Sequence, residues 1–352
     1  MPALPFDFPR CFDDVRSLLD RLPGPDDDAA ARAAAREALL TKPPGALGRL
    51  EEVAAWMAAW QGRHPARVDL ALVLVFAGNH GVARQGVSAF PAEVTAQMVT
   101  NFEAGGAAVN QLSDAVGARL DVRALDLDRP TGDFTAGPAM SEDECIAAFA
   151  TGMESVADGA DLVCVGEMGI GNTTAAAAVA CAIHGGAAAD WVGPGTGLDG
   201  DGVARKAAVV ARALDHHAGR FDDGLEALRR VGGRELAAIA GAVLAARLKR
   251  VPVLLDGYVA TAAAAALEGT RAGALDHCLA GHRSAEPAHD RLLTTLGKRP
   301  LLDLGMRLGE ASGATLAVAV VKAALATHAG MATFAEAGVS DRDDEDARPA
   351  AS

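Results

Sequence analysis

The sequence has 352 residues, of which 50% are hydrophobic and 22% are charged, and its formal net charge is −14. This length and apolar share suffice for a large core or for two unequal lobes. The negative charge and the lack of basic clusters argue against nucleic-acid binding. The five cysteines form no CxxC pair, so we expect reduced thiols in a cytoplasmic protein. They are Cys11, Cys145, Cys164, Cys181 and Cys278.

The two ends of the chain differ in composition from its middle. The start, Met1-Pro-Ala-Leu-Pro-Phe-Asp7, is acidic and broken by proline, so we expect no signal peptide. No uninterrupted apolar run reaches spanning length, so we expect no membrane segment. We expect residues 1–34 to form a variable N-terminal arm and residues 341–352 to form a disordered acidic tail.

The middle of the chain alternates between strand and helix patterns. Asp69–Phe76 is continuously apolar, which predicts a central parallel strand that is covered on both faces. Further strands are predicted at Leu120–Leu125, Leu162–Val165 and Val251–Leu255, with shorter ones near Trp191 and Cys278. A capping box, Ser141-Glu-Asp-Glu144, predicts the start of a helix.

This alternation predicts an α/β fold with an open, mostly parallel, Rossmann-like sheet and helices on both faces. Ligands of such sheets bind at the carboxyl ends of the strands, where His80, Glu167 and Asp256 follow predicted strands. We assign residues 69–299 to this large domain. Helical spacing from Pro44 onward, and helices without strands near the C-terminus, predict a smaller helical lobe from residues 35–68 and 300–340.

Two glycine turns precede predicted helices. Gly166-Glu-Met-Gly-Ile-Gly-Asn-Thr-Thr174 follows a buried strand, and Gly193-Pro-Gly-Thr-Gly-Leu-Asp199 precedes the helix that carries Lys206. A glycine turn that leads into a helix offers free N–H groups to a phosphate. The first turn is neither a Walker loop nor a dinucleotide fingerprint. The pair predicts a phosphorylated small molecule as ligand; the alternative is two ordinary turns and a surface lysine.

Glu310 lies in a third turn, Met306-Arg-Leu-Gly-Glu-Ala-Ser-Gly313, ahead of a long apolar helix. A carboxylate at the mouth of such a helix is partly desolvated, which raises its pKa and suits it to accept a proton. The alternative is a glutamate that caps the helix and is stabilised by the helix dipole.

Seven motifs together carry a resemblance to a known family. In chain order they are Lys42–Glu51, Ala77–Val82, Gly86–Pro91, Gly166–Thr174, Leu255–Gly257, Ser284–Pro287 and Met306–Gly313. Over about residues 35 to 340 the chain resembles the nicotinate-nucleotide–dimethylbenzimidazole phosphoribosyltransferases, which activate the lower ligand of cobalamin. Asn79 departs from the pattern, because the family usually has aspartate there, and a pairing role for that carboxylate is therefore in doubt.

The resemblance implies transfer of phosphoribose from nicotinate mononucleotide to 5,6-dimethylbenzimidazole by a cytoplasmic homodimer. Nicotinate leaves from a pyridinium and needs no proton, whereas the acceptor must lose its ring N–H, so the reaction requires one general base. We expect the protein to use no cofactor and no metal, and to bind neither nucleic acid nor a membrane. The histidines near Cys278 (His277, His282 and His289) match no standard zinc spacing.

The resemblance also assigns roles residue by residue. Glu310 matches the general base, Glu167 the second active-site carboxylate, and Lys206 a lysine that helps to hold the nucleotide. The nucleotide contacts are expected from Gly169, Asn172, Thr173, Gly195, Thr196, Ser284, Arg307, Leu308 and Gly309, and the base contacts from His80, Phe90, Gln97 and Met98. How phosphate and ribose are divided among these residues stays open.

Two alternative functions also stay open. A homologue with the same chemistry could use another acceptor, such as a different benzimidazole, a purine or a phenol. A non-catalytic nucleotide-binding protein could share the fold, but it would have no use for a desolvated base at Glu310.

Overall fold

The computed structural model describes residues 6–340, so the expected acidic tail at 341–352 lies outside the described residues. Contacts divide the described chain into two compact units. Residues 6–23 and 69–318 form the sheet unit, and residues 24–68 and 319–340 form the helical unit.

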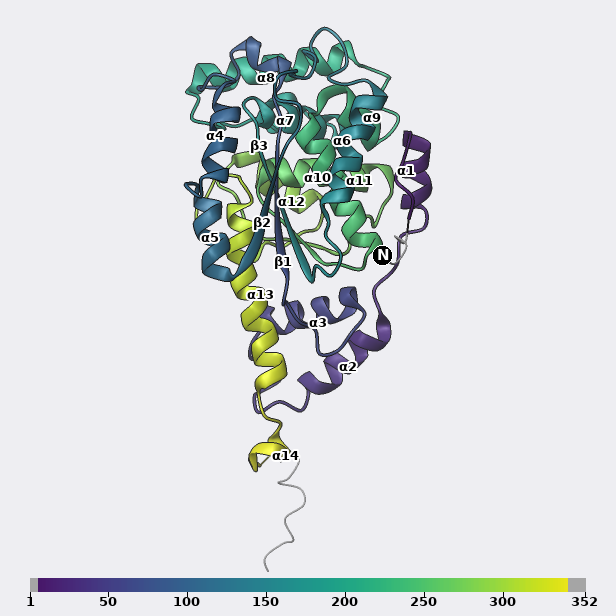
Figure 1. Ribbon diagram of the computed structural model, residues 1–352, viewed down its shortest axis with the longest axis vertical. Coiled ribbons are helices and arrows are strands. Elements are labelled where there is room, and N and C mark those ends of the chain that lie inside the picture. Colours follow the sequence, from purple (N-terminus) through teal and green to yellow (C-terminus); the bar gives the residue numbers. More distant parts are fainter. Residues whose placement is uncertain (1–5, 341–352) are drawn as a thin grey trace, which may run out of the picture. The chain divides into compact units, whose positions relative to one another are not determined.

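The sheet unit is built on five parallel strands in the order β2-β1-β3-β4-β5 (Figure 1). Their bounds are β1 Ala71–Ala77, β2 Ala118–Ala124, β3 Leu162–Met168, β4 Val253–Leu255 and β5 Cys278–Ala280. The predicted open parallel sheet is confirmed. The strand predicted near Trp191 is wrong, because a 3-10 turn, η2 (Ala188–Asp190), stands there. Trp191 is buried by packing, with its indole N–H donating to Gly185 O at 2.8 Å.

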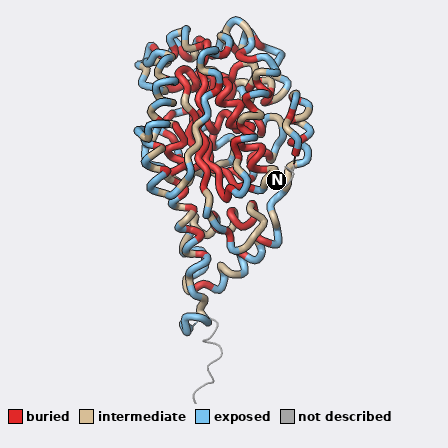
Figure 2. Tube along the Cα trace, in the orientation of Figure 1, coloured by how far each residue is buried: buried red, intermediate tan, exposed pale blue. Residues whose placement is uncertain are grey.

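Alternate residues of the central strands face two different layers. Leu72, Leu74 and Phe76 of β1 point into the main core, together with Val163 and Val165 of β3. This core is covered by a group of helices that includes α10 and α11, which pack directly on the strands. Buried chain is concentrated around the sheet and these helices (Figure 2). The group comprises α6 Glu142–Ser155, α7 Asn172–His184, α9 Gly224–Val231, α10 Arg234–Leu248 and α11 Tyr258–Thr270.

The capping box predicted at the start of α6 is confirmed. The Ser141 hydroxyl accepts the backbone N–H of Glu144, and the Glu144 carboxylate accepts that of Ser141. The other helices of the sheet unit are α1 Phe12–Leu19, η1 Gly81–Gln85, α4 Val94–Glu103, α5 Ala108–Val116, α8 Gly200–His216 and α12 Pro287–Thr295.

Helix α13 (Ser312–Gly330) begins in the sheet unit, and the boundary between the units falls within it. Its first turns pack on the face of β3 opposite the main core, where the Cys164 thiol donates to Ala314 O at 3.5 Å. By length and composition it is the one described helix that could cross a membrane, yet half of its most apolar window is buried. We interpret it as a core helix.

The helical unit contains α2 (Asp27–Glu37), α3 (Arg49–Gln61), the second part of α13 and α14 (Phe334–Ala337). A buried lysine ties its elements together, because Lys42 Nζ lies 2.9 Å from Glu37 Oε1 and 2.7 Å from Glu51 Oε1. The motif Lys42–Glu51 therefore has a structural basis within this unit.

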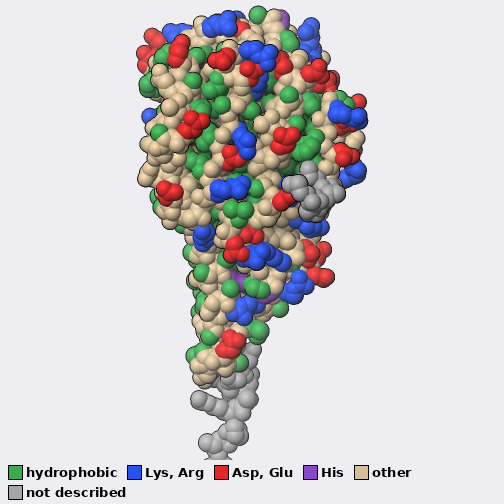
Figure 3. Space-filling model, in the orientation of Figure 1, with side chains coloured by type: hydrophobic (Ala, Val, Ile, Leu, Met, Phe, Trp, Pro, Cys, Tyr) green, Lys and Arg blue, Asp and Glu red, His purple; other side chains and the backbone are tan. Residues whose placement is uncertain are grey.

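Acidic and basic side chains are interspersed over the visible surface (Figure 3). On that face, neither sign of charge is gathered in one place (Figure 3).

Candidate active site

The order of the strands places a ligand crevice between β1 and β3. From β1 the chain moves outward to β2, and from β3 it moves in the opposite direction to β4. The loops after β1 and β3 therefore diverge at this point. Ligands of open α/β sheets bind at such a switch point. A cavity of about 260 Å³ lies at this edge, and Glu167, Tyr258, Ser284 and Glu286 are among the residues that line it.

Most of the predicted site residues meet in this cavity. Eleven of them line it: Phe90, Glu167, Gly169, Asn172, Thr173, Gly195, Thr196, Ser284, Arg307, Leu308 and Gly309. Glu310 follows directly on Gly309, and Lys206 hydrogen-bonds to Thr173. The lining itself does not include Glu310 or Lys206, and it also lacks His80, Gln97 and Met98. Gln97 is exposed on α4, Met98 is half-buried there, and His80 is buried.

The first glycine turn joins β3 to α7 where it packs against the β1 loop. A Cβ on Gly169 would lie 2.6 Å from Gly78 O, so only glycine fits there. Gly171 has a φ of 97°, a left-handed conformation that glycine adopts freely. The Thr95 hydroxyl accepts the Ile170 N–H at 3.1 Å, which ties the turn to the start of α4.

Lys206 on α8 is buried, which excludes the alternative of a surface lysine. Its ammonium donates to Thr173 Oγ1 and to Gly193 O, at 3.0 Å each. Burial lowers the pKa of Lys206 to about 8, although the nearby charge of Glu286 acts in the opposite direction. The lysine therefore joins the two predicted glycine turns with a charge that changes near physiological pH.

Glu286 is a site residue that the sequence analysis did not select. Its carboxylate lines the cavity and accepts the Gly195 N–H, with its two oxygens 3.4 and 3.3 Å away. Burial raises the pKa of Glu286, and the charge of Lys206 opposes this shift. The motif Ser284–Pro287 contained the signal, but the resemblance assigned a role to Ser284 alone.

Glu310 is buried in a turn with unusual backbone geometry. Glu310 and Ala311 have φ values of 61° and 59°, in the left-handed region that side chains disfavour. Burial raises the pKa of Glu310 to about 7, and the negative charge of Asp256 adds to the shift. The predicted rise in pKa is confirmed. The capping alternative is wrong, because Asp256 accepts the N–H groups of Gly313 and Ala314 at the start of α13.

Glu167 lies at the end of β3 against the same turn. A Cβ on Gly309 would lie 2.7 Å from Glu167 Oε1, so glycine allows this close approach. Burial raises the pKa of Glu167 well above its ordinary value, and the charges of Asp256, Glu235 and Glu310 add to the shift. A hydrogen bond from the Asn172 amide opposes it. Glu167 lines the cavity and Glu310 adjoins the lining residue Gly309, so two buried carboxyl groups with raised pKa values lie close together.

His80 has a partner that lies far away in the sequence. His80 Nε2 is 2.5 Å from Glu235 Oε1 on α10, and both side chains are fully buried. Asn79, at the position where aspartate was expected, donates its amide to Leu127 O at 3.0 Å. The charge beside His80 thus comes from Glu235, which sequence spacing could not have indicated.

Comparisons with known proteins agree with this geometry. A family model described as phosphoribosyltransferase matches residues 22–339. Proteins of Rhizobium leguminosarum bv. trifolii and Rhizobium etli, both named nicotinate-nucleotide–dimethylbenzimidazole phosphoribosyltransferase, are 61% and 62% identical to this chain. Each match covers 94% of this chain and 98% of the relative. This chain belongs to that phosphoribosyltransferase family.

Solved structures extend the similarity to three dimensions. The crystal structure of CobT from Thermus thermophilus is 44% identical in sequence and superposes with a TM-score of 0.84. The match covers 89% of this chain and 99% of that one. The resemblance drawn from the seven motifs is therefore confirmed.

The histidines near Cys278 have other partners in this phosphoribosyltransferase fold. His289 Nδ1 accepts the Ser284 N–H at 2.9 Å, and its Nε2 lies 3.0 Å from Thr261 Oγ1. His282 Nε2 lies 3.5 Å from Asp256 Oδ1. Within residues 6–340, no group of three or more histidine, cysteine or acidic side chains is arranged to hold a metal ion.

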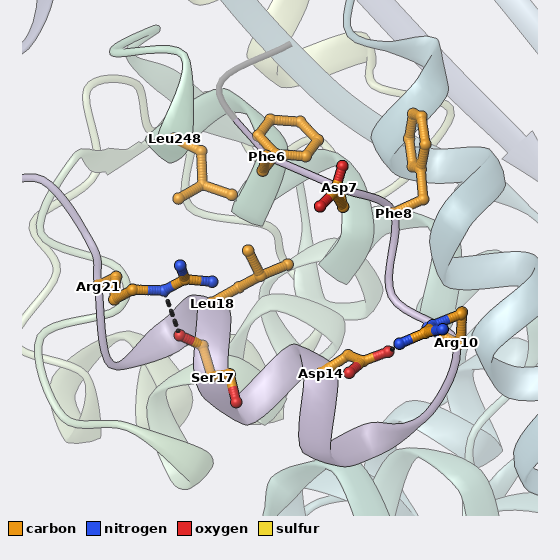
Figure 4. A pocket seen from close by; sticks show the side chains of 9 residues that line it. All are labelled: Phe6, Asp7, Phe8, Arg10, Asp14, Ser17, Leu18, Arg21 and Leu248. Carbon is orange, nitrogen blue, oxygen red and sulfur yellow. Dashed lines mark hydrogen bonds and ion pairs between the residues drawn. The ribbon is translucent and has the colours of Figure 1, made fainter.

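A larger hollow, of about 850 Å³, lies beside α1 and away from the strand ends (Figure 4). Its polar groups are engaged locally: Arg10 Nε lies 3.4 Å from Asp14 Oδ2, and Arg21 Nε donates to Ser17 O at 3.0 Å. We place the active site in the smaller cavity, because that cavity holds the buried carboxyl groups with raised pKa values.

Proposed function

We propose that this protein transfers phosphoribose from nicotinate mononucleotide to 5,6-dimethylbenzimidazole. The products are α-ribazole 5′-phosphate and nicotinate, in assembly of the nucleotide loop of cobalamin. The observation that carries the proposal is the buried carboxyl of Glu310, with a pKa of about 7, in a chain whose curated relatives bear this name. Such a pKa suits a general base near neutral pH.

Glu310 takes the proton that the acceptor must lose. One ring nitrogen of the benzimidazole attacks C1′ of the ribose, the bond from C1′ to the pyridinium nitrogen breaks, and nicotinate leaves with that electron pair. The proton on the other ring nitrogen passes to the Glu310 carboxylate. Attack on the face opposite the leaving group converts the β-linkage into an α-linkage.

Glu167 stabilises the positive charge that develops at C1′. Its raised pKa favours the protonated form in the free protein, where other carboxylates surround it. The bound pyridinium is a cation, and a nearby cation favours the ionised form of a carboxyl group. Binding of the cationic substrate therefore favours the ionised form of Glu167, which is the form that stabilises the charge at C1′.

The nucleotide is held where the two glycine turns meet. Lys206, the N-terminus of α7 and the turn around Gly195 provide positive charge and N–H groups for the phosphate. Arg307, whose guanidinium donates to Gly195 O at 3.1 Å, and Ser284 complete this part of the site.

The acceptor binds against the apolar rim. Phe90 and Leu308 line the cavity and are 52% and 56% exposed, which is unusual for such side chains and suits a flat aromatic ligand. Gln97 and Met98 belong to α4, whose start is tied to the first glycine turn through Thr95. His80, paired with Glu235, packs against Gly169 and Gly171 of that turn.

The function is tested by incubating the protein with nicotinate mononucleotide and a panel of acceptors: dimethylbenzimidazole, other benzimidazoles, adenine and phenol. Products are identified by mass spectrometry, with and without EDTA. We expect α-ribazole 5′-phosphate as the main product, at an unchanged rate in EDTA. A larger kcat/KM for another acceptor would reassign the substrate. Lack of transfer to every acceptor would favour a non-catalytic nucleotide-binding protein.

We further propose that the protein is a cytoplasmic homodimer. All five cysteines are unpaired, which fits a reducing compartment. Leu39 and Val339 of the helical unit are 58% and 50% exposed and offer apolar surface to a second copy. Light scattering coupled to size exclusion measures the mass directly, and a monomer at micromolar concentration would contradict the dimer.

A further inference from the structure

The start of α13 is held in place by the ends of neighbouring strands. A Cβ on Gly166 of β3 would lie 2.1 Å from Ala311 N, so the turn packs directly on this strand. A Cβ on Gly281, just after β5, would lie 2.7 Å from Ala314 Cα. The two strands on either side of β4 thus leave no room for the turn to shift toward the sheet.

Asp256, just after β4, provides the polar part of this contact. Its Oδ1 accepts the N–H groups of Gly313 at 2.8 Å and of Ala314 at 2.9 Å. These are among the N–H groups that a helix cannot satisfy internally, and a carboxylate there is further stabilised by the helix dipole. The side chain of Asp256 is only 1% exposed, so these bonds are shielded from water.

The residues that need this support lie just before Gly313 and Ala314, whose N–H groups bind Asp256. Glu310 and Ala311 are consecutive non-glycine residues in the left-handed region, and each costs roughly 1 kcal/mol or more to hold there. Within the described chain, Asp256 Oδ2 and Glu310 Oε2 are both buried without a hydrogen-bond partner. The two carboxyl groups are also close enough for the charge of Asp256 to act on Glu310.

We propose that Asp256 is a positioning residue that holds Glu310 in its left-handed turn and places a negative charge beside it. This inference rests on the proposed role of Glu310 as the base. The titratable groups around the turn come from each neighbouring strand end: Glu167 from β3, Asp256 from β4, and His282 from the loop after β5. Behind Glu167 lies Glu235 of α10, paired with His80.

The sign of the effect follows from the charge. A negative Asp256 disfavours a second negative charge on Glu310 and so raises its pKa, in addition to burial. Asp256→Asn keeps an oxygen that can accept both N–H groups but removes the charge. We therefore expect the acidic limb of the kcat/KM profile to move down by roughly half to one pH unit.

Asp161 provides a matched control at the opposite edge of the sheet. Its Oδ2 accepts the N–H groups of Asp69 and Leu70, at 2.9 and 3.0 Å, just before β3 begins. Asp161→Asn makes the same chemical change to a carboxylate that accepts two backbone N–H groups, far from Glu310. We expect it to alter stability and to leave the pH profile in place.

Asp256→Ala tests the positioning role, because it removes both hydrogen bonds. We expect kcat to fall about tenfold or more, since a small misplacement of a catalytic group is costly. Adding Ala311→Gly should restore part of kcat, because glycine adopts the left-handed conformation without strain. If Asp256→Asn alone is poorly soluble, the pair Asp256→Asn with Ala311→Gly carries the same pH measurement.

The possible outcomes separate this inference from the proposed function. An unshifted acidic limb in Asp256→Asn, while Glu310→Gln is inactive, would overturn the role of Asp256 and leave Glu310 as the base. Full activity of Glu310→Gln would instead overturn the proposed base itself. A limb that moves equally in Asp161→Asn would show a general effect of charge and would also overturn the inference.

Discussion

The two ends of the cavity differ in how completely their polar groups are satisfied. At the nucleotide end, Lys206 donates to Thr173 and Gly193, and Glu286 accepts the Gly195 N–H. At the Glu310 end, one carboxylate oxygen of Glu310 and one of Asp256 are buried without a partner in the described chain. One end is pre-ordered before any ligand arrives, and the other keeps unused hydrogen-bonding capacity.

This difference matches what binding and catalysis require. A binding group gains from being fixed in advance, because less conformational freedom is lost when the ligand arrives. A base gains from poor solvation, which raises its pKa toward the pH at which it works. Burial of charge is costly to the fold at both ends, since it raises the pKa of Glu310 and lowers that of Lys206, but the charge of Lys206 is satisfied by two hydrogen bonds.

The largest effect is expected from Glu310→Gln. The amide keeps the shape of the side chain but cannot accept the proton, so kcat should fall by about 10²–10⁴-fold. The dissociation constant for nicotinate mononucleotide, measured by calorimetry, should stay within a few-fold, because the nucleotide end is intact. Near-normal turnover in a folded variant would remove the distinction between the two ends.

Lys206→Ala should act on the other end. Losing a charge-assisted hydrogen bond typically weakens binding by roughly 1.5–3 kcal/mol, so KM for nicotinate mononucleotide should rise about 10- to 100-fold. KM for the acceptor should change much less. Lys298→Ala is the control, because Lys298 likewise donates two hydrogen bonds, to the carbonyls of Leu275 and Cys278, but neither partner lines the cavity, whereas Thr173 does. A rise in the acceptor KM would place Lys206 at the wrong end.

The sequence revealed the local parts of this site. The continuous apolar pattern of Asp69–Phe76 predicted a strand covered on both faces, and β1 is buried along its whole length. The glycines around Glu310 predicted a tight turn before a helix, and that turn is present. Each of these features depends on residues adjacent in the chain, where periodicity and turn chemistry carry the information.

The sequence could not reveal which distant groups meet. Glu235 is 155 residues from His80, and Asp256 is 57 residues from Gly313, so no spacing rule connects them. A strand is predicted near Trp191 because a short apolar stretch does not distinguish a buried strand from a buried side chain that follows a surface turn. Partners of buried charges are set by tertiary packing, and it is these partners that tune Glu310 and Glu167.

The pH dependence of activity should contain an acidic limb from Glu310 and an alkaline limb from Lys206. Glu310 must be ionised to act, so kcat/KM should fall about tenfold per unit as the pH drops below the pKa of about 7. Lys206 must be protonated to hold a phosphate, so KM for the nucleotide should rise as the pH passes about 8. Lys206→Arg should abolish the alkaline limb, because arginine stays charged. An acidic limb near 4.5, the ordinary value for glutamate, would contradict the desolvated base.

The smallest effect concerns stability, and it tests whether the Glu310 end is costly to the fold. The carboxyl has a pKa of about 7 in the folded protein and an ordinary value of 4.5, so the folded state holds this proton more tightly. The stabilisation that this proton gives to the folded state is therefore lost as the pH rises from about 4.5 to 7. Above pH 7 the buried carboxylate destabilises the fold by its full amount. Glu310→Gln removes that cost and should raise the free energy of unfolding by roughly 1–3 kcal/mol at pH 8.

Urea unfolding at pH 8 and pH 4 measures the difference in the free energy of unfolding, which should vanish or reverse at pH 4. Glu103→Gln, on an exposed carboxylate at the end of α4, is the control and should show no such dependence. A less stable Glu310→Gln at pH 8 would mean that the carboxylate supports the fold.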